Sequence, residues 1–156
     1  MTLCFLGAVT SAQFAALCER AAQLDAPSFE LVFERLELWR RSRILAATVA
    51  QVPAAGIALA LALANAAQAV GLSPSLAEWR PHLTLLRGVT EGLAGLVADA
   101  APADPEAPAG DATALPRLTL RPTRFYLAES QGLGAHADIG AQVPRYARLV
   151  SWPLRS

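Results

Sequence analysis

The sequence predicts a single α+β domain over residues 1–156 whose strands pair mainly antiparallel. A chain of 156 residues is long enough to bury one core without disulfides or metals. Its strand and helix patterns return in an order that favours antiparallel pairing over a doubly wound parallel sheet. There is no Gly-rich phosphate loop, nucleophile elbow or CxxC pair, so the signatures of three large enzyme classes are missing.

The first third of the chain predicts a strand, a helix and a pair of strands. Residues 2–7 (TLCFLG) are a short apolar run, so we expect a strand there. Residues 10–24 predict a helix with Thr10 and Ser11 as candidate N-caps. Residues 29–39 alternate as a strand pair whose phase slips midway. The apolar residues of its two halves are Phe29, Leu31 and Phe33, then Leu36 and Leu38.

The middle of the chain predicts a strand over residues 43–50 and a helix over residues 53–71. The proline at the start and the glycine at the end of the second segment suit the two ends of a helix. The run is mostly alanine and contains Asn65 and Gln68, so it falls short of the roughly 18 strongly apolar residues of a bilayer span. We therefore expect a buried core helix and no membrane partner. No secretory signal is present, and we expect a cytoplasmic protein.

The second half predicts further strands separated by a loop. Residues 81–88 (PHLTLLRG) predict a strand, and residues 91–97 a brief helix. Residues 99–115 are rich in Pro and Ala, contain acids but no bases, and predict a mobile surface loop. Residues 117–130 and 145–154 predict two or three strands around a glycine-containing loop.

Composition excludes several classes of partner. The formal net charge is zero, so no overall field points to nucleic acid or membrane. All 13 basic residues are arginines, whose planar guanidinium suits phosphate better than a lysine does. Cys4 and Cys18 have no metal-ligand spacing and are expected to be small core residues. His136 is expected to lie on the surface, and we expect no metal and no cofactor.

Two predicted strands repeat one pattern. Thr2-Leu3 in MTLCFLG corresponds to Thr84-Leu85 in HLTLLRG. Residues two apart on a strand share a face, so His82 and Thr84 project together, and Leu83 and Leu85 are expected to face the core. A histidine transfers protons near neutral pH and a hydroxyl donates to phosphate oxygens.

These residues resemble the 2H phosphoesterase superfamily. PHLTLLR, then FYLAES and YARLVSWPL, are similar to the bacterial RNA 2′,3′-cyclic phosphodiesterases, also called 2′-5′ RNA ligases. The resemblance covers nearly the whole chain and implies two lobes related by pseudo-two-fold symmetry. Each lobe would hold a mainly antiparallel sheet with helices outside, and two His-x-Thr/Ser motifs would face each other across a central cleft.

The resemblance also implies the chemistry. One histidine activates water for attack on a 2′,3′-cyclic phosphate at an RNA end or in a cyclic nucleotide, and the other protonates the leaving ribose oxygen, without a metal. His82 would be the catalytic histidine of the second motif, in an acid or a base role that stays open. Thr2 and Thr84 would bind the phosphate. Arg87 is either a phosphate ligand or a solvated strand end.

MTLCFLG matches the first motif only from its second position, and the expected histidine would precede Met1. We expect a start at an internal methionine or a shortened chain, with impaired turnover. One alternative is a natural variant that binds RNA ends without catalysis. Another is a fragment that associates through an exposed sheet edge; otherwise we expect a monomer.

Further candidates for RNA contact lie outside the two motifs. Three arginines, Arg40, Arg41 and Arg43, either line a path for RNA or form a solvated strand end. The aromatic residues Tyr126 and Trp152 either stack on a base or pack in the core.

Overall fold

The computed structural model describes residues 1–75, 78–90, 117–135 and 142–156. The predicted helix over residues 91–97, the predicted loop over residues 99–115 and His136 lie outside these ranges. The described elements follow the order α1, β1, a 3₁₀ turn (Arg40–Ser42), β2, α2, β3, β4, β5 and β6.

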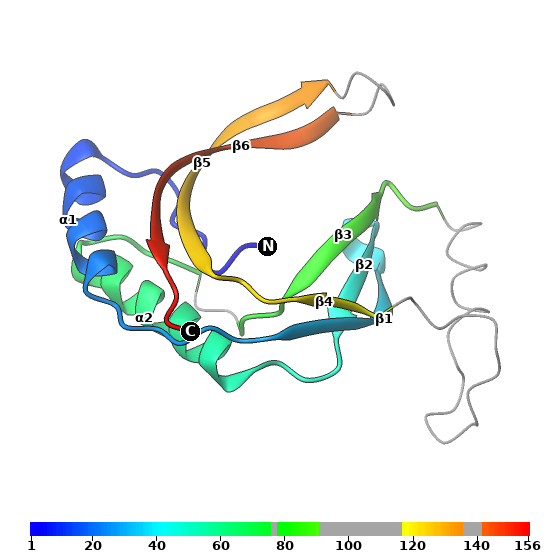
Figure 1. The fold of residues 1–156 in the computed structure, drawn as a ribbon. Helices are drawn as coiled ribbons and strands as arrows, with labels where there is room; N and C mark the ends of the chain where they lie inside the picture. The colour runs from blue at the N-terminus through cyan, green and yellow to red at the C-terminus, as the bar shows by residue number, and fades with distance from the viewer. Residues whose placement is uncertain (76–77, 91–116, 136–141) are drawn as a thin grey trace.

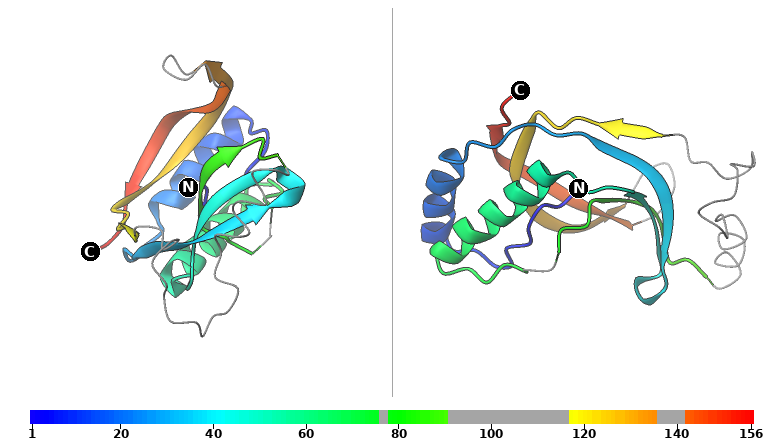
Figure 2. Two further views of the ribbon diagram at one scale, coloured as in Figure 1. Left: turned by 90° about the vertical axis from the view of Figure 1, so that its right-hand side faces the viewer. Right: turned by 90° about the horizontal axis from the view of Figure 1, so that it is seen from below.

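Two antiparallel sheets and two helices make up the described fold (Figures 1 and 2). The larger sheet has the order β3-β2-β1-β4, formed by His82–Arg87, Ile44–Val49, Leu31–Trp39 and Leu118–Leu120. A long ribbon of β5 (Arg124–Ala135) and β6 (Gln142–Pro153) forms the other sheet. The helices α1 (Ser11–Ala22) and α2 (Ala54–Ala69) lie on one side of the ribbon, and the larger sheet lies on the other (Figure 1). The predicted α+β class with antiparallel sheets is confirmed.

The helix ends follow the expected chemistry. The Thr10 hydroxyl accepts from the backbone N–H of Gln13, and the Gln13 side chain accepts from the backbone N–H of Thr10, which completes a capping box. The N-cap of α2 is Pro53, and Gly71 follows its end with a φ of 77°, a conformation that glycine adopts readily. No described helix is long and apolar enough to cross a membrane.

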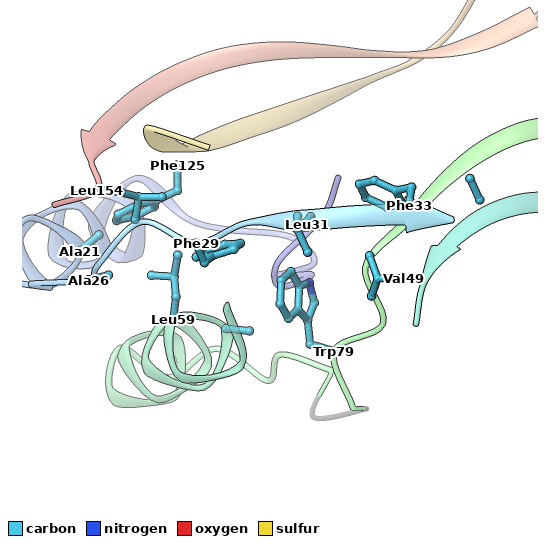
Figure 3. Close-up of a cluster of buried hydrophobic side chains, with 12 residues drawn as sticks. Ala21, Ala26, Phe29, Leu31, Phe33, Val49, Leu59, Trp79, Phe125 and Leu154 are labelled. Carbon is cyan, nitrogen blue, oxygen red and sulfur yellow. The ribbon is translucent and has the colours of Figure 1, made fainter. Parts of the chain in front are cut away.

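One core joins both sheets to α2. Phe29, Leu31 and Phe33 of the β1 region meet Leu59 of α2 and Trp79 of the segment before β3 (Figure 3). Phe125 and Leu154 reach the same cluster from the ribbon. The expected inward face of residues 29–33 is therefore confirmed, and the helix over residues 54–69 is a core helix as predicted.

Residues 31–39 of the predicted strand pair over residues 29–39 form one strand, not two. The phase slip is real and is a β-bulge, because Phe33 pairs with Val49 whereas Arg35 pairs with Thr48. The extra residue moves Arg35 to the face opposite Phe33. The slip in the apolar alternation therefore indicates a bulge within β1 and not a turn between two strands.

The predicted strand over residues 2–7 is wrong. This segment has no strand assignment, because it pairs with neither edge of the β5–β6 ribbon. Side chains hold it in place: Leu3 packs on the main core cluster, and Leu6 packs on a second cluster between α1 and α2. The Trp79 indole N–H also donates to the Thr2 carbonyl at 3.1 Å.

Candidate active site on strand β3

A β-bulge sets the orientation of the side chains on β3. Thr84 pairs with Ala46 and Leu86 pairs with Leu45, so Leu85 has no partner on β2. Leu83 packs on the core as predicted. The prediction that Leu85 also faces the core is wrong, because Leu85 is the bulged residue and is 46% exposed.

The same bulge brings Arg87 to the face of His82 and Thr84. His82, Thr84 and Arg87 pair with Thr48, Ala46 and Ile44, which are spaced by two along β2. Directly paired residues point to the same side of a sheet, and residues two apart share a face. On a regular strand Arg87, three residues after Thr84, would point to the opposite face. The three residues predicted on this strand therefore share one face, which we call the β3 face.

The His82 ring is held in a defined orientation. Its Nδ1 lies 2.8 Å from the Arg80 carbonyl oxygen. A carbonyl can only accept, so Nδ1 carries the hydrogen and Nε2 is left to exchange a proton. The Trp39 ring packs edge-on against the imidazole, with the ring centroids 4.7 Å apart. This is the arrangement that a catalytic histidine needs, with one nitrogen fixed and the other available.

A carboxylate organises the neighbours of His82. Glu37 accepts hydrogen bonds from the Trp39 indole N–H at 2.8 Å, the Arg80 guanidinium at 2.9 Å and the Thr48 hydroxyl at 3.0 Å. The hydrogen bond from Trp39 is the main cause that lowers the pKa of Glu37, and Thr48 and Arg80 add to it against partial burial. The Arg80 guanidinium also lies 5.4 Å from the Trp39 ring centroid. We call Glu37, Trp39, Thr48 and Arg80 the Glu37 network.

No sequence pattern pointed to the Glu37 network. Glu37 and Arg80 are 43 residues apart, and no motif links them. The one local signal is the strand period, which places Glu37 and Trp39 on the same side of β1.

Thr2 lies close to the start of β3. Its carbonyl accepts from Trp79, three residues before His82, and the views of Figures 1 and 2 agree that the chain start lies beside this end of the strand. The Thr2 residue is exposed. The two predicted threonines therefore belong to neighbouring segments of the fold.

Other candidates lie elsewhere. The Arg43 guanidinium donates to the carbonyls of Gly88 and Val89, which makes it part of the β2–β3 connection. Trp152 stacks on Phe125 in the core, whereas Tyr126 is 44% exposed. Burial raises the pKa of the Cys4 and Cys18 thiols, which disfavours the nucleophilic thiolate. Within the described ranges, no three His, Cys, Asp or Glu side chains gather as a metal site.

Comparison with known proteins gives consistent matches. A family model described as LigT like phosphoesterase matches residues 1–46. The RNA 2′,3′-cyclic phosphodiesterase of Escherichia coli (strain K12) is 34% identical over 93 residues, which are 60% of this chain and 53% of the relative. The chain thus spans about half the length of this curated relative.

Solved structures match over nearly the whole chain. A crystal structure of a phosphoesterase aligns with a TM-score of 0.71 and 28% identity, covering 99% of this chain and 76% of that one. The apo structure of E. coli LigT aligns with a TM-score of 0.70 and 27% identity, covering 99% and 75%. With its antiparallel sheets and its HxT strand, the chain is therefore similar in sequence and in fold to the LigT-like phosphoesterases.

Proposed function

We propose that this protein is an RNA 2′,3′-cyclic phosphodiesterase, which opens a terminal 2′,3′-cyclic phosphate to a 2′-phosphate. The observation that carries the proposal is the β3 face, on which the bulge at Leu85 unites His82, Thr84 and Arg87. The curated relative has this activity by name. E. coli LigT has also been solved with 3′-AMP and with ATP, which supports a nucleotide or an RNA end as the ligand.

The proposed reaction needs two proton transfers on opposite sides of phosphorus. The water oxygen bonds to phosphorus and gives up a proton, while the bond from phosphorus to the ribose 3′ oxygen breaks and that oxygen gains a proton. His82 performs one of these transfers through Nε2, since Nδ1 is bonded to the Arg80 carbonyl. The resemblance assigns the other transfer to a histidine of the first motif, which residues 1–156 do not contain. Each transfer accelerates the reaction by roughly 10²–10⁴-fold.

Neighbouring groups stabilise the phosphate. The Thr84 hydroxyl and the Arg87 guanidinium project from the same face as His82, and both donate to non-bridging oxygens in our proposal. Thr2 is the corresponding donor of the first motif. With the proton transfers assigned to imidazoles and the charge assigned to Arg87, the proposal includes no metal and no cofactor.

Three further statements belong to the proposal. The site also joins RNA ends: when the 5′-hydroxyl of a second RNA takes the place of water, its oxygen bonds to phosphorus and loses its proton, the bond from phosphorus to the ribose 3′ oxygen breaks and that oxygen gains a proton, and a 2′-5′ linkage results. The protein acts as a monomer in the cytoplasm. Residues 1–156 form one domain.

The position of the phosphate in the reaction product tests the proposed phosphodiesterase activity. The full chain is incubated with adenosine 2′,3′-cyclic phosphate and with a short RNA that ends in a cyclic phosphate, and products are resolved by phosphorus NMR. We expect the 2′-phosphate alone, formed at an impaired rate because residues 1–156 contain only one of the two motif histidines. Formation of the 3′-phosphate would overturn the proposed direction of ring opening. Tight binding of the cyclic end without any product would favour the alternative reading of a non-catalytic RNA-end-binding relative.

A further inference from the structure

One face of the β5–β6 ribbon carries exposed aromatic and basic side chains. Tyr126 and Tyr146 are 44% and 55% exposed, and Arg148 between them is exposed as well. Tyr126 pairs with Ser151, and Ser130 pairs with Tyr146, so the tyrosines lie on the same side of the ribbon. We call Tyr126, Arg148 and Tyr146 the Tyr–Arg strip.

A β-bulge places the arginine on this face. Leu127 pairs with Val150, but Ala128 pairs with Arg148, so Leu149 has no partner on β5. On a regular strand Arg148 would oppose Glu129 and point to the other side. The bulge at Leu149 thus acts on Arg148 as the bulge at Leu85 acts on Arg87, and bulges commonly re-aim side chains beside active sites.

The strip is organised before any ligand binds. The Arg148 guanidinium lies 4.8 Å from the Tyr126 ring centroid, within the range of a cation–π contact. The ion pairs of the described residues are Arg80–Glu37, Arg117–Glu34, Arg121–Glu30 and Arg155–Asp25, so within that part of the chain no carboxylate neutralises Arg148. Its charge therefore remains available to an anion.

The strip faces away from the helices. Phe125 and Leu127, which alternate with Tyr126, pack on the clusters that include α1 and α2. Because neighbouring residues of a strand point to opposite sides, Tyr126 points away from the helices. The larger sheet, which includes β3, lies on that side of the ribbon (Figures 1 and 2).

We propose that the Tyr–Arg strip binds the unpaired nucleotides that precede the cyclic phosphate of an RNA substrate. Bases stack on the tyrosine rings and on the planar Arg148 guanidinium, and the Arg148 charge attracts the backbone phosphates. Such stacking does not depend on sequence, because every base has a π-face. The inference rests on the proposed function, since it takes the reacting end to be that of an RNA chain.

Binding of three probes tests the strip. The probes are a single-stranded RNA pentanucleotide with a cyclic phosphate end, the same chain with abasic residues before the last nucleotide, and the cyclic mononucleotide. We expect the wild-type chain to bind the pentanucleotide most tightly. Tyr126→Ala should weaken that binding by roughly 5- to 150-fold and should bring it close to that of the abasic chain, whereas Tyr126→Phe should stay within about threefold because the ring is kept.

The charge is tested separately. Arg148→Gln should weaken binding of the pentanucleotide and lower the slope of log affinity against log salt by about 0.7. Arg20→Gln is the matched control, because Arg20 is an exposed arginine on α1, on the far side of the ribbon. It should leave the salt slope unchanged.

The inference and the proposed function fail in different ways. Equal affinity of the wild-type chain for the intact and the abasic pentanucleotide would overturn the proposal that the Tyr–Arg strip binds nucleotides. Unchanged pentanucleotide binding by Tyr126→Ala would do the same, even if the mononucleotide were hydrolysed. If binding depended on stacking but no cyclic phosphate were opened, the proposed role of the Tyr–Arg strip would be supported and the proposed enzymatic activity would be wrong.

Discussion

Glu37 is the residue that connects three side chains around His82. It accepts from an indole, a guanidinium and a hydroxyl, and Trp39, one of these donors, packs against the imidazole. Exposed ion pairs contribute little to stability on their own. Glu37 therefore matters mainly because it fixes Trp39 and Arg80, and Arg80 also supplies the carbonyl that orients His82.

The lowered pKa of Glu37 predicts a pH-dependent contribution to stability. A carboxylate whose pKa falls on folding stabilises the protein above its unfolded value of about 4.3, and this contribution is lost as pH falls through the folded value. Glu37→Gln should therefore lower the urea midpoint at pH 7, and the difference from the wild type should shrink below about pH 4. Urea titrations at both pH values measure it.

Glu19→Gln serves as the control, because Glu19 is an exposed glutamate on α1 outside the described ion pairs. A difference between Glu37→Gln and the wild type that grew as pH fell would contradict the assignment of Glu37 as the acceptor of these bonds.

At the scale of elements, Gly56 decides how closely α2 approaches Trp79. A Cβ at this position would overlap Trp79 Cζ3, and would lie 2.6 Å from Trp79 Cη2 and 3.3 Å from Phe29 Cε2. Helix propensity alone predicts that Gly56→Ala stabilises the protein by about 1 kcal/mol. Overpacking should reverse the sign and destabilise it by about 1–3 kcal/mol. Urea unfolding gives the sign directly, and a stabilised variant would show that the helix contact is not close packed.

The bulge on β3 predicts that this strand tolerates the deletion of one residue. Deletion of one residue of the Leu85–Leu86 pair leaves Thr84, one leucine and Arg87 opposite Ala46, Leu45 and Ile44, which is regular pairing. The variant should fold cooperatively and keep activity on a cyclic nucleotide within about tenfold, since the removed residue is the unpaired one.

Deletion of Leu83 is the matched control. It removes the same residue type from the regularly paired part of β3 and takes a side chain from the core. It should abolish activity by moving His82 out of phase with Thr84. If both deletions behaved alike, the bulge would not be the cause of the shared face.

The sequence predicted the elements better than their phases. The helix starts at Thr10 and Pro53 could be predicted from the sequence because capping chemistry is local. The bulge at Leu85 could not be predicted, since Leu85 and Leu86 are both apolar and either could face the core. The segment over residues 2–7 has a strand-like composition, but pairing depends on a free edge that composition does not reveal. The Glu37 network joins three strand regions and has no local signature.

At the scale of the whole molecule, one core cluster joins the two sheets. Phe33 and Val49 from the larger sheet share it with Phe125 and Leu154 from the ribbon (Figure 3). The single-domain prediction therefore has a measurable consequence. Tryptophan fluorescence, which reports Trp39, Trp79 and Trp152, and circular dichroism should give one coincident urea transition. Two separated transitions would mean that the sheets unfold as independent units.

In our proposal, His82 transfers a proton through Nε2 in the opening of a cyclic phosphate. The most direct measurement is kcat for adenosine 2′,3′-cyclic phosphate with the wild-type chain and with His82→Asn, whose amide keeps a polar group but cannot exchange protons near neutral pH. We expect kcat to fall by roughly 10²–10⁴-fold while the urea midpoint stays unchanged. A kcat that survived this substitution would contradict this proposal.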